Sequence, residues 1–392
     1  MKNIPYGRQN INEEDIEAVC SVLRSDWLTQ GPKVREFEDA LAGQCGARHC
    51  ILVTNGTMAL HLACLALEVA SGDTGLTSPI SFIASSNCIA FCGGTPDFAD
   101  IDPKNLCLSP ENVEEYCETR KIPKVVIPVD FAGVPADLPR FRELAEKYGF
   151  KLIEDAAHSI GSRYHHKGKD YACGSCAHTD LAVFSFHPVK TITTGEGGAI
   201  MTNDDGLAEK LRLLANHGIV REASKFVNQK SFPSWYHEMQ SMGYNGRITD
   251  IQCALGLSQL RRLNTVKARR QEIVRRYNQE LKELVKKEMV ILPPWPDDID
   301  PCYHLYTLRL GERCKVPRDT LFLGLKDKGI HCQVHYIPIY RQPFYQKKDV
   351  YHSERFPEAE KYYASCISLP LFPDLDEESQ NYVIEMLYDH IR

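Results

Sequence analysis

A lysine that follows a run of apolar residues is the side chain best suited to covalent chemistry in this sequence. Lys190 comes directly after the segment 184–189 (FSFHPV) and precedes the glycine-rich turn 195–198 (GEGG). A lysine at a desolvated site loses part of its preference for the charged form and becomes a usable amine nucleophile. The glycines do not follow the G-x-G-x-x-G or P-loop pattern, so neither a dinucleotide loop nor a P-loop is predicted. Taken alone, the segment is better explained by a surface lysine beside a glycine loop.

An acid stands at the end of a second apolar segment. Glu154 and Asp155 follow residues 151–153 (KLI) and precede Ala156-Ala157-His158. In open α/β sheets, ligands bind beyond the carboxyl ends of the strands, so an acid at this place is an expected ligand contact. By position alone, a carboxylate that caps the next helix is an equal alternative.

Two turns of small and polar residues have the character of anion sites. In residues 54–60 (TNGTMAL) a predicted strand ends and a helix begins, and free N–H groups at a helix start form an anion cradle. Residues 243–247 (GYNGR) place an Asn and an Arg between glycines ahead of a long helix. Each turn alone also fits ordinary turn and capping chemistry.

The order of these groups along the chain matches the needs of one cofactor. The phosphate of pyridoxal phosphate needs backbone donors, its pyridine nitrogen needs a carboxylate, and its aldehyde needs a lysine. The turn at 54–60, the acid at 155 and the lysine at 190 supply these groups. This chemistry requires no metal, and we predict none.

Short aliphatic segments alternate with helical ones between residues 49 and 215. Most of the short segments are apolar on both faces, which is typical of strands covered by helices on both sides of a mainly parallel α/β sheet. The predicted strands are residues 49–53, 75–78, 124–129, 151–154, 181–186 and 199–202. The predicted helices are residues 12–24, 34–42, 58–70, 81–91, 139–148 and 207–215.

The C-terminal part has a different pattern. From residue 250 to 287 the sequence predicts long helix, and its dense charges at 261–287 are better explained by a solvated helix face than by nucleic-acid binding. After the break at 293–296 (PPWP), strands at 303–310 and 332–336 and a helix at 318–328 predict a small α+β domain. We therefore expect a large domain at residues 1–255 and the linking helix with the small domain at 256–392.

Composition limits the classes of function. The chain has 392 residues with 52 acidic and 46 basic side chains, a net charge of −6, so no basic excess indicates nucleic acid as a partner. No apolar run is long enough to span a membrane, and the polar first 14 residues lack a signal-peptide core. We expect a cytoplasmic protein.

The 15 cysteines are odd in number and irregular in spacing, which predicts reduced, mostly buried thiols. Cys173 and Cys176 form a CxxC near histidines, but a second CxxC is absent, so a zinc or redox site is the minor interpretation. The basic stretch 165–169 (HHKGK) has no assigned role and fits a solvated loop.

The four motifs together closely resemble the sugar aminotransferase family within the fold-type I pyridoxal-phosphate enzymes. The motifs at 54–60, 154–158, 185–198 and 243–247 match that family in order and spacing, and the similarity extends from residue 6 to residue 372. The resemblance implies a large domain built on a mainly parallel seven-stranded sheet, a small C-terminal α+β domain, and a homodimer with shared active sites. A departure is the segment 130–133 (DFAG), where the family often has a basic or aromatic pair.

The resemblance also implies roles for individual residues. Lys190 would be the catalytic lysine and form a Schiff base with the cofactor, Asp155 would pair with the pyridine nitrogen, and His158 would lie near the ring oxygen. The remaining cofactor contacts would be Phe82 on the ring face, Gly56, Thr57 and Ser185 at the phosphate, and Asn245 at the phosphate of the neighbouring subunit. The substrate would contact Tyr6, Arg247, His335 and Tyr336.

The implied reaction moves an amino group from glutamate to a keto-sugar nucleotide. Residues 4–9 (IPYGRQ), 27–32 (WLTQGP) and 335–338 (HYIP) most resemble the branch that makes UDP-4-amino-4,6-dideoxy-N-acetyl-β-L-altrosamine for pseudaminic acid. Amination at C4 or C3 of a GDP- or dTDP-linked keto sugar remains an alternative. The family branch that dehydrates at C3 carries histidine in place of the lysine, and Lys190 argues against it. A cofactor-binding regulatory protein without turnover is the alternative from another class.

Overall fold

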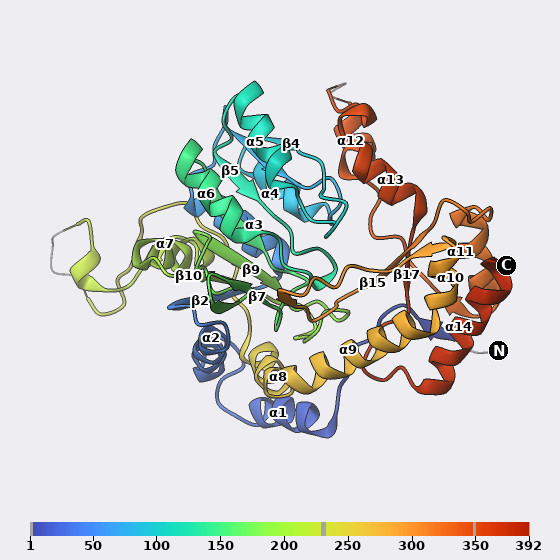
Figure 1. The fold of residues 1–392 in the computed structure, drawn as a ribbon. Coiled ribbons are helices and arrows are strands. Elements are labelled where there is room, and N and C mark those ends of the chain that lie inside the picture. The colour runs from blue at the N-terminus through green and yellow to red at the C-terminus, as the bar shows by residue number, and fades with distance from the viewer. Residues whose placement is uncertain (1–2, 229–232, 348–349, 392) are drawn as a thin grey trace.

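The central element of the computed structural model, which describes residues 3–228, 233–347 and 350–391, is a seven-stranded sheet. Its strands are β2 His49–Val53, β3 Thr74–Thr77, β4 Thr95–Phe98, β5 Val125–Ile127, β6 Lys151–Asp155, β9 Leu181–Ser185 and β10 Gly198–Thr202. The spatial order is β2-β10-β9-β6-β5-β3-β4, and β10 is antiparallel to both of its neighbours while the other pairs are parallel (Figure 1). The mainly parallel sheet predicted from sequence is confirmed.

Helices cover both faces of this sheet, which is why its strands are apolar on both sides. One face packs on α3 Gly56–Ala66, α4 Ala84–Phe91 and α7 Asp205–Ala215. The other packs on α2 Pro32–Cys45, α5 Pro110–Thr119, α6 Leu138–Tyr148 and α8 Asp250–Arg261. Along β2, Ile51 and Val53 point to the first set of helices, whereas Cys50 and Leu52 point to the second.

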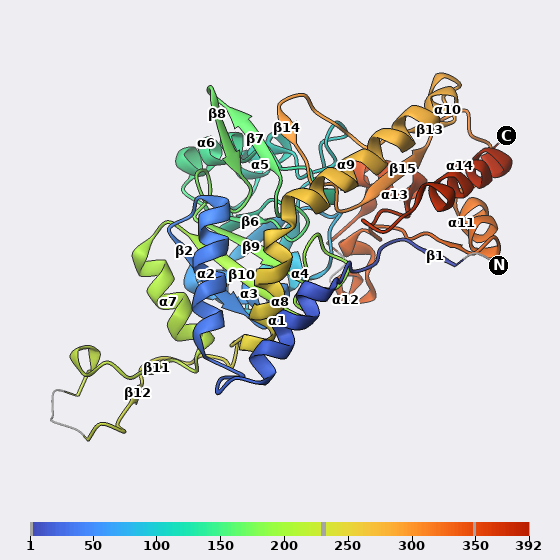
Figure 2. The ribbon, with the colours of Figure 1, turned by 90° about the horizontal axis from the view of Figure 1, so that it is seen from below.

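A second, antiparallel sheet lies at the other end of the molecule. It contains β13 Val290–Ile291, β15 Tyr306–Leu310 and β17 Cys366–Leu369, packed in one core with α9 Leu263–Glu280, α11 Arg318–Asp327 and α14 Glu377–Ile391. Figure 2 shows α9 running from α8 at the large sheet to this second core. The strand β1 Ile4–Pro5 pairs with β16 Ile330–His331, so the N-terminal segment joins the C-terminal part.

The remaining strands form small pairs outside the two sheets. The pair β7 Arg163–His166 and β8 Lys169–Ala172 forms a hairpin with the basic stretch 165–169 at its tip, and β14 Ile299–Asp300 joins its edge. The pair β11 Ile219–Val220 and β12 Glu238–Met239 projects from the body in both views (Figures 1 and 2). The other helices are α1 Glu13–Leu23, α10 Lys282–Lys286, α12 Pro343–Gln346 and α13 Pro357–Ser365.

The structure departs from the sequence-based prediction in several places, of which the following bear on the large sheet and the cavity. The strand β4 and the helix α5 were not predicted, and the long helix after residue 250 is divided into α8, α9 and α10. The strand expected at 332–336 is wrong: only Gln333 makes an isolated bridge, to Ser368, and the segment around His335 is a loop. A proline at 338 lacks the N–H that a longer ladder would need.

The division into domains at residue 255 stays a proposal. The two sheets are consistent with two domains, but side chains of the C-terminal part, among them Tyr340, Tyr351 and Tyr362, pack with β3, β5, α5 and α6 in one hydrophobic core. In the described part of the chain, no helix is both apolar enough and long enough to cross a bilayer. All 15 cysteines are free thiols, as predicted.

Candidate active site

A cavity of about 510 Å³ lies at the carboxyl edge of the large sheet. It gathers side chains that follow β2, β6 and β9, together with Tyr6 from the N-terminal segment and His335 and Tyr336 from the C-terminal part. Its polar and aromatic lining comprises Tyr6, Asn55, Thr57, Ser81, Phe82, Ser85, Asp155, His158, Ser185, His187, Lys190, Glu196, His304, His335 and Tyr336. The edge at which parallel strands end is where ligands bind in such sheets.

One end of the cavity is built as an anion cradle. Helix α3 begins at Gly56, directly after β2, and its cap Asn55 accepts a hydrogen bond from the Met58 N–H at 2.8 Å. The first-turn N–H groups of a helix have no carbonyl partner within the helix, and its dipole is positive at this end. The hydroxyl-bearing residues Thr57 and Ser185 line the same end of the cavity.

Close packing at Gly56 makes this cradle sensitive to a single methyl group. A Cβ at position 56 would lie 2.9 Å from Cβ and 3.2 Å from Oγ of Ser185. We expect Gly56→Ala to displace Ser185 and to raise the dissociation constant of the cofactor about tenfold, a loss of about 1.4 kcal/mol. The dissociation constant is measured by equilibrium titration that follows cofactor fluorescence. As the control, Gly43→Ala in α2, where a Cβ would meet nothing within 4 Å, should leave the dissociation constant unchanged. An equal change of the constant in the two variants would contradict a phosphate site at Gly56.

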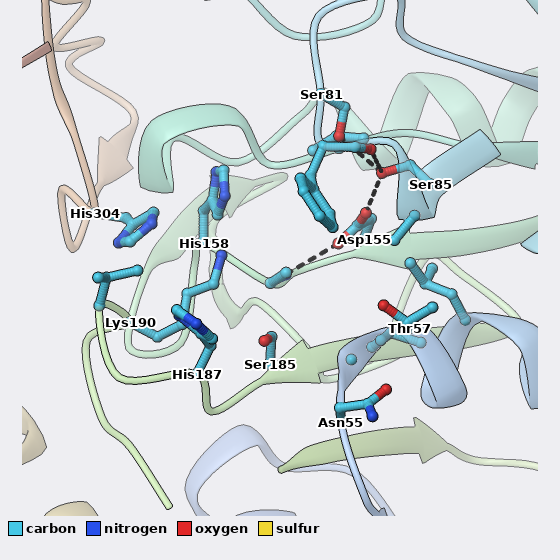
Figure 3. Close-up of a pocket in the computed structure, with 18 of the residues that line it drawn as sticks. Asn55, Thr57, Ser81, Ser85, Asp155, His158, Ser185, His187, Lys190 and His304 are labelled. Atoms are coloured by element: carbon cyan, nitrogen blue, oxygen red, sulfur yellow. Dashed lines mark hydrogen bonds between the residues drawn. The ribbon is translucent and has the colours of Figure 1, made fainter. Parts of the chain in front are cut away.

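A buried carboxylate lies farther along the cavity. Asp155 ends β6 and is 3% exposed. Its Oδ2 accepts from the Ser85 hydroxyl at 2.7 Å, and its Oδ1 accepts from the Ala157 N–H at 3.2 Å (Figure 3). Burial raises the pKa of Asp155, while these two donors and the charge of Lys190 lower it. The two donors fix the orientation of the carboxylate and stabilise its ionised form.

The amine of Lys190 shares this cavity with Asp155. Lys190 lies in the loop after β9, where its backbone N–H donates to the His187 carbonyl at 2.9 Å. Burial lowers the pKa of Lys190 to about 8, with Asp155 opposing the shift. An amine with this pKa is partly neutral near neutral pH and can act as a nucleophile or a base.

Four imidazoles line the cavity together with Lys190, those of His158, His187, His304 and His335, and the best defined is that of His158. Its Nδ1 accepts from the Ala132 N–H at 3.3 Å, so the proton is on Nε2, which faces the Tyr336 hydroxyl at 3.3 Å. Ala132 has the left-handed φ of 58°, which turns its N–H toward the histidine. Burial holds the pKa of His158 well below its ordinary value, with Lys190 contributing, so the ring is neutral.

The structure brings together most of the residues predicted from sequence. Phe82, which is 54% exposed, lines the cavity, and Tyr6 lies with its ring 5.3 Å from that of His335. Asn245 and Arg247 do not line it: Arg247 donates to Asn216 at 3.0 Å, and Asn245 forms a β-bridge with Asn216. Their expected contacts to cofactor and substrate are not made within this cavity and stay predictions.

Several lining residues were not predicted as site residues. They are Asn55, Ser81, Ser85, His187, Glu196 and His304. The available signal for Ser85 was a polar residue in the mostly apolar helix α4. Its hydroxyl hydrogen-bonds that of Ser81, which precedes the helix, and donates to the Asp155 carboxylate at the end of β6. No local signal marks His304, which enters the cavity from the segment before β15.

Behind the cavity, Asp130, Glu154 and Cys173 form a buried cluster in which their ligand atoms lie within 4.8 Å of one another. Asp130 accepts from Ser159 and from the Ala136 N–H, and Glu154 accepts from the Gly174 N–H. Burial raises the pKa of both carboxyl groups, and of the Cys173 thiol. Burial and the proximity of the two acids favour a proton on one of them, and the role of the CxxC stays a prediction.

Asp130→Asn is expected to remove a pH dependence of stability. The fold raises the pKa of both acids, so it favours their protonated forms. Their contribution to the free energy of unfolding is therefore complete at a pH below the ordinary carboxyl pKa, and it is lost as the pH rises through the raised pKa values of the folded state. The variant should gain about 1–2 kcal/mol over the wild type between about pH 5 and pH 9. Urea unfolding across this range measures it, with exposed Asp39→Asn as the control. Parallel profiles for the wild type and Asp130→Asn would contradict a proton held by one of the two acids.

The helix-covered, mainly parallel sheet, with a partly buried lysine and a buried carboxylate in the cavity at its carboxyl edge, defines a fold-type I pyridoxal-phosphate enzyme. Residues 9–388 match the DegT/DnrJ/EryC1/StrS aminotransferase family, and the chain belongs to that family. It is therefore a sugar aminotransferase, and its cofactor is pyridoxal phosphate.

Similar proteins cover the full length of the chain. The spore coat polysaccharide biosynthesis protein SpsC of Bacillus subtilis is 38% identical over 99% of this chain and 97% of its own. The structure of Helicobacter pylori PseC, an aminotransferase in the biosynthesis of pseudaminic acid, superposes with a TM-score of 0.86 at 30% identity, over 100% of this chain and 99% of that one. The structure of Streptococcus pneumoniae Spr1654, described as a putative sugar aminotransferase in its PMP form, superposes with a TM-score of 0.86 at 28% identity, over 98% of both chains.

The residues of the cavity fit this cofactor. The N-terminus of α3 offers backbone N–H donors for a phosphate. Position 56 has room for glycine only, because a Cβ there would collide with Ser185. A buried carboxylate and an amine with a lowered pKa occupy the same cavity, as a pyridine nitrogen and an aldehyde require.

Proposed function

We propose that this enzyme transfers the amino group of glutamate to the C4 keto group of a UDP-linked 4-keto-6-deoxy-N-acetylhexosamine. The observation that carries the reaction type is the convergence of Lys190, Asp155 and the α3 cradle in one cavity. The substrate rests on the similarity to PseC and on the N-terminal segment, where Tyr6 lines the cavity beside His335 and Tyr336.

Each group in the cavity has a separate task in this reaction. The α3 N-terminus with Thr57 and Ser185 would hold the cofactor phosphate, and Asp155 would hold a proton on the ring nitrogen. The chemistry supplied by bound pyridoxal phosphate is an electron sink for the carbon that loses its proton.

Lys190 performs the proton transfers. Its Nζ removes the proton from the α-carbon of glutamate, and in the second half-reaction it delivers a proton to C4 of the sugar. A positioned acid–base group of this kind contributes about 10²–10⁴-fold to the rate. The lowered pKa of about 8 keeps a usable fraction of the amine neutral at physiological pH.

The functional unit in this proposal is a homodimer. Asn245 and Arg247 lie outside the cavity of their own chain, and Asn245 forms a bridge with Asn216, which comes shortly before β11. The described lining of the cavity holds no arginine and no lysine besides Lys190, although a sugar nucleotide carries a diphosphate. A second copy that supplies Arg247 would provide the missing positive charge.

A panel of keto-sugar nucleotides tests the proposal. The holoenzyme is incubated with glutamate and UDP-, dTDP- or GDP-linked 4-keto-6-deoxy sugars, and products are identified by mass spectrometry and NMR. We expect a 4-amino product from the UDP-N-acetyl sugar and 2-oxoglutarate in equal amount. Amination only of dTDP or GDP sugars would replace the proposed substrate, and absence of any glutamate-dependent product would favour a binding protein without turnover.

A further inference from the structure

Three thiols and an imidazole meet where α3 packs on α4, outside the lining of the catalytic cavity. Cys64 lies on α3 and Cys88 on α4, and both are fully buried, whereas Cys92, directly after α4, is partly exposed. The Cys64 thiol hydrogen-bonds with the thiols of Cys88 and Cys92. The Sγ of Cys92 also lies 4.0 Å from the carbonyl oxygen of His61, which comes about one turn before Cys64 on α3. The reaction proposed above uses none of these four side chains.

The surroundings of Cys92 favour its thiolate form. The Cys64 thiol and the His61 side chain hydrogen-bond with Cys92 and lower its pKa to about 6, although burial opposes this shift. In other parts of the core, burial raises the pKa of thiols such as those of Cys45 and Cys253. His61 is only 8% exposed, and its Nε2 has no hydrogen-bond partner among the described residues. Because the thiolate is the nucleophile, Cys92 is the thiol of this cluster that is set to react.

The exposure of the thiols gives Cys92 and Cys64 different roles. A small oxidant can reach the partly exposed sulfur of Cys92 from solvent. Cys64 is 0% exposed, and its hydrogen bonds to the two other thiols hold its pKa well above the ordinary value, so it is protected from such an attack. The Cys88 thiol donates to the Ser85 carbonyl of its own helix at 3.4 Å. Cys64 is therefore the buried partner that can react with an oxidised Cys92, since their sulfurs already contact each other and an S–S bond is about 2.0 Å long.

We propose that Cys64 and Cys92 are a site of reversible oxidation, at which hydrogen peroxide joins them in a disulfide between α3 and α4. The Cys92 thiolate attacks one oxygen of the peroxide, so that an S–O bond forms, the O–O bond breaks and hydroxide leaves; the sulfur is oxidised and the peroxide is reduced. The sulfur of Cys64 then attacks that of Cys92. An S–S bond forms, the S–O bond breaks, and the Cys64 proton leaves with the hydroxyl group as water. The disulfide fastens the helix that begins at the phosphate cradle to the helix that carries Ser85, and a thiol reductant opens it again.

Peroxide treatment of the holoenzyme, followed by alkylation and mass spectrometry without reduction, tests the site. Proteolysis after Glu68 and after Phe91 places the three cysteines in separate peptides. We expect a disulfide between Cys64 and Cys92 in the wild type that dithiothreitol removes. In Cys64→Ser, we expect a sulfenic acid on Cys92 that dimedone traps. The rate of this trapping should change by less than about twofold between about pH 7 and pH 8.5, whereas oxidation of an ordinary thiol should become more than about tenfold faster.

Cys88→Ala is the matched control, because it removes the third thiol of the cluster and should leave the disulfide in place. Cys20 and Cys314 are also partly exposed and should stay reduced under the same treatment. Cys64→Ala replaces Cys64→Ser if that chain does not fold. A wild-type chain without the disulfide between Cys64 and Cys92, a disulfide that includes Cys88, or oxidation of Cys20 to the same extent as Cys92 would overturn the proposal.

Discussion

Lys190→Ala is expected to lower turnover by about 10⁴-fold or more while the protein stays folded. The lysine is the only amine in the described lining of the cavity, so no other side chain can take over its proton transfers. It makes no salt bridge among the described residues, so its removal should leave the fold intact, although the pKa of the buried Asp155 should rise because the charge of Lys190 lowers it. The measurement is the first half-reaction, followed by the change in cofactor absorbance after glutamate is added.

Lys190→Arg and Lys210→Ala sharpen the interpretation of this result. Arginine keeps the positive charge but cannot act as a nucleophile or a base at neutral pH, so it should be as inactive as alanine. Lys210 pairs with Glu68 on the surface and lies far from the chemistry, so Lys210→Ala should keep full activity. Near-normal turnover in either Lys190 variant, with a circular dichroism spectrum like that of the wild type, would contradict the assignment.

The strands of the large sheet were predictable because both of their faces are buried, which leaves a continuous aliphatic signal. β2 and β6 begin at the predicted residues. β4 was not predicted because it is an edge strand that contains Pro96 and the exposed Thr95, so it lacks a continuous aliphatic signal. α5 did carry a start signal, Ser109 followed by Pro110, where the Ser109 hydroxyl accepts from the Asn112 N–H.

The site was predictable where its residues lie at the ends of strands in recognisable motifs. Asp155 and Lys190 belong to this class, and the structure places both in one cavity. Ser85 and His304 do not, because each reaches the cavity through a contact between segments far apart in the chain. Such contacts depend on how α4 and the segment before β15 pack, and neither packing leaves a local pattern in the sequence.

Asp155→Asn is expected to lower turnover by about 10²–10³-fold without preventing cofactor binding. Asparagine is nearly the same shape: its one amide oxygen can still accept from the Ala157 N–H, and its NH2 group can donate to the Ser85 hydroxyl oxygen, so the local structure should survive. It carries no charge, however, and cannot hold a proton on the ring nitrogen, so negative charge at the reacting carbon loses its stabilisation. The phosphate cradle lies at the other end of the cavity and keeps its donors. Steady-state kinetics with glutamate, together with the cofactor dissociation constant, separate these two effects.

Ser85→Ala provides the graded comparison for Asp155→Asn. Removal of the Ser85 hydroxyl takes away one of the two donors to the carboxylate but leaves its charge, so the pKa of Asp155 should rise further and turnover should fall less, by about tenfold. The loss in Ser85→Ala should diminish as pH increases, because the carboxylate is again ionised, whereas the loss in Asp155→Asn should persist at every pH. A pH-independent loss in both variants would mean that Ser85 acts through packing and not through the charge of Asp155.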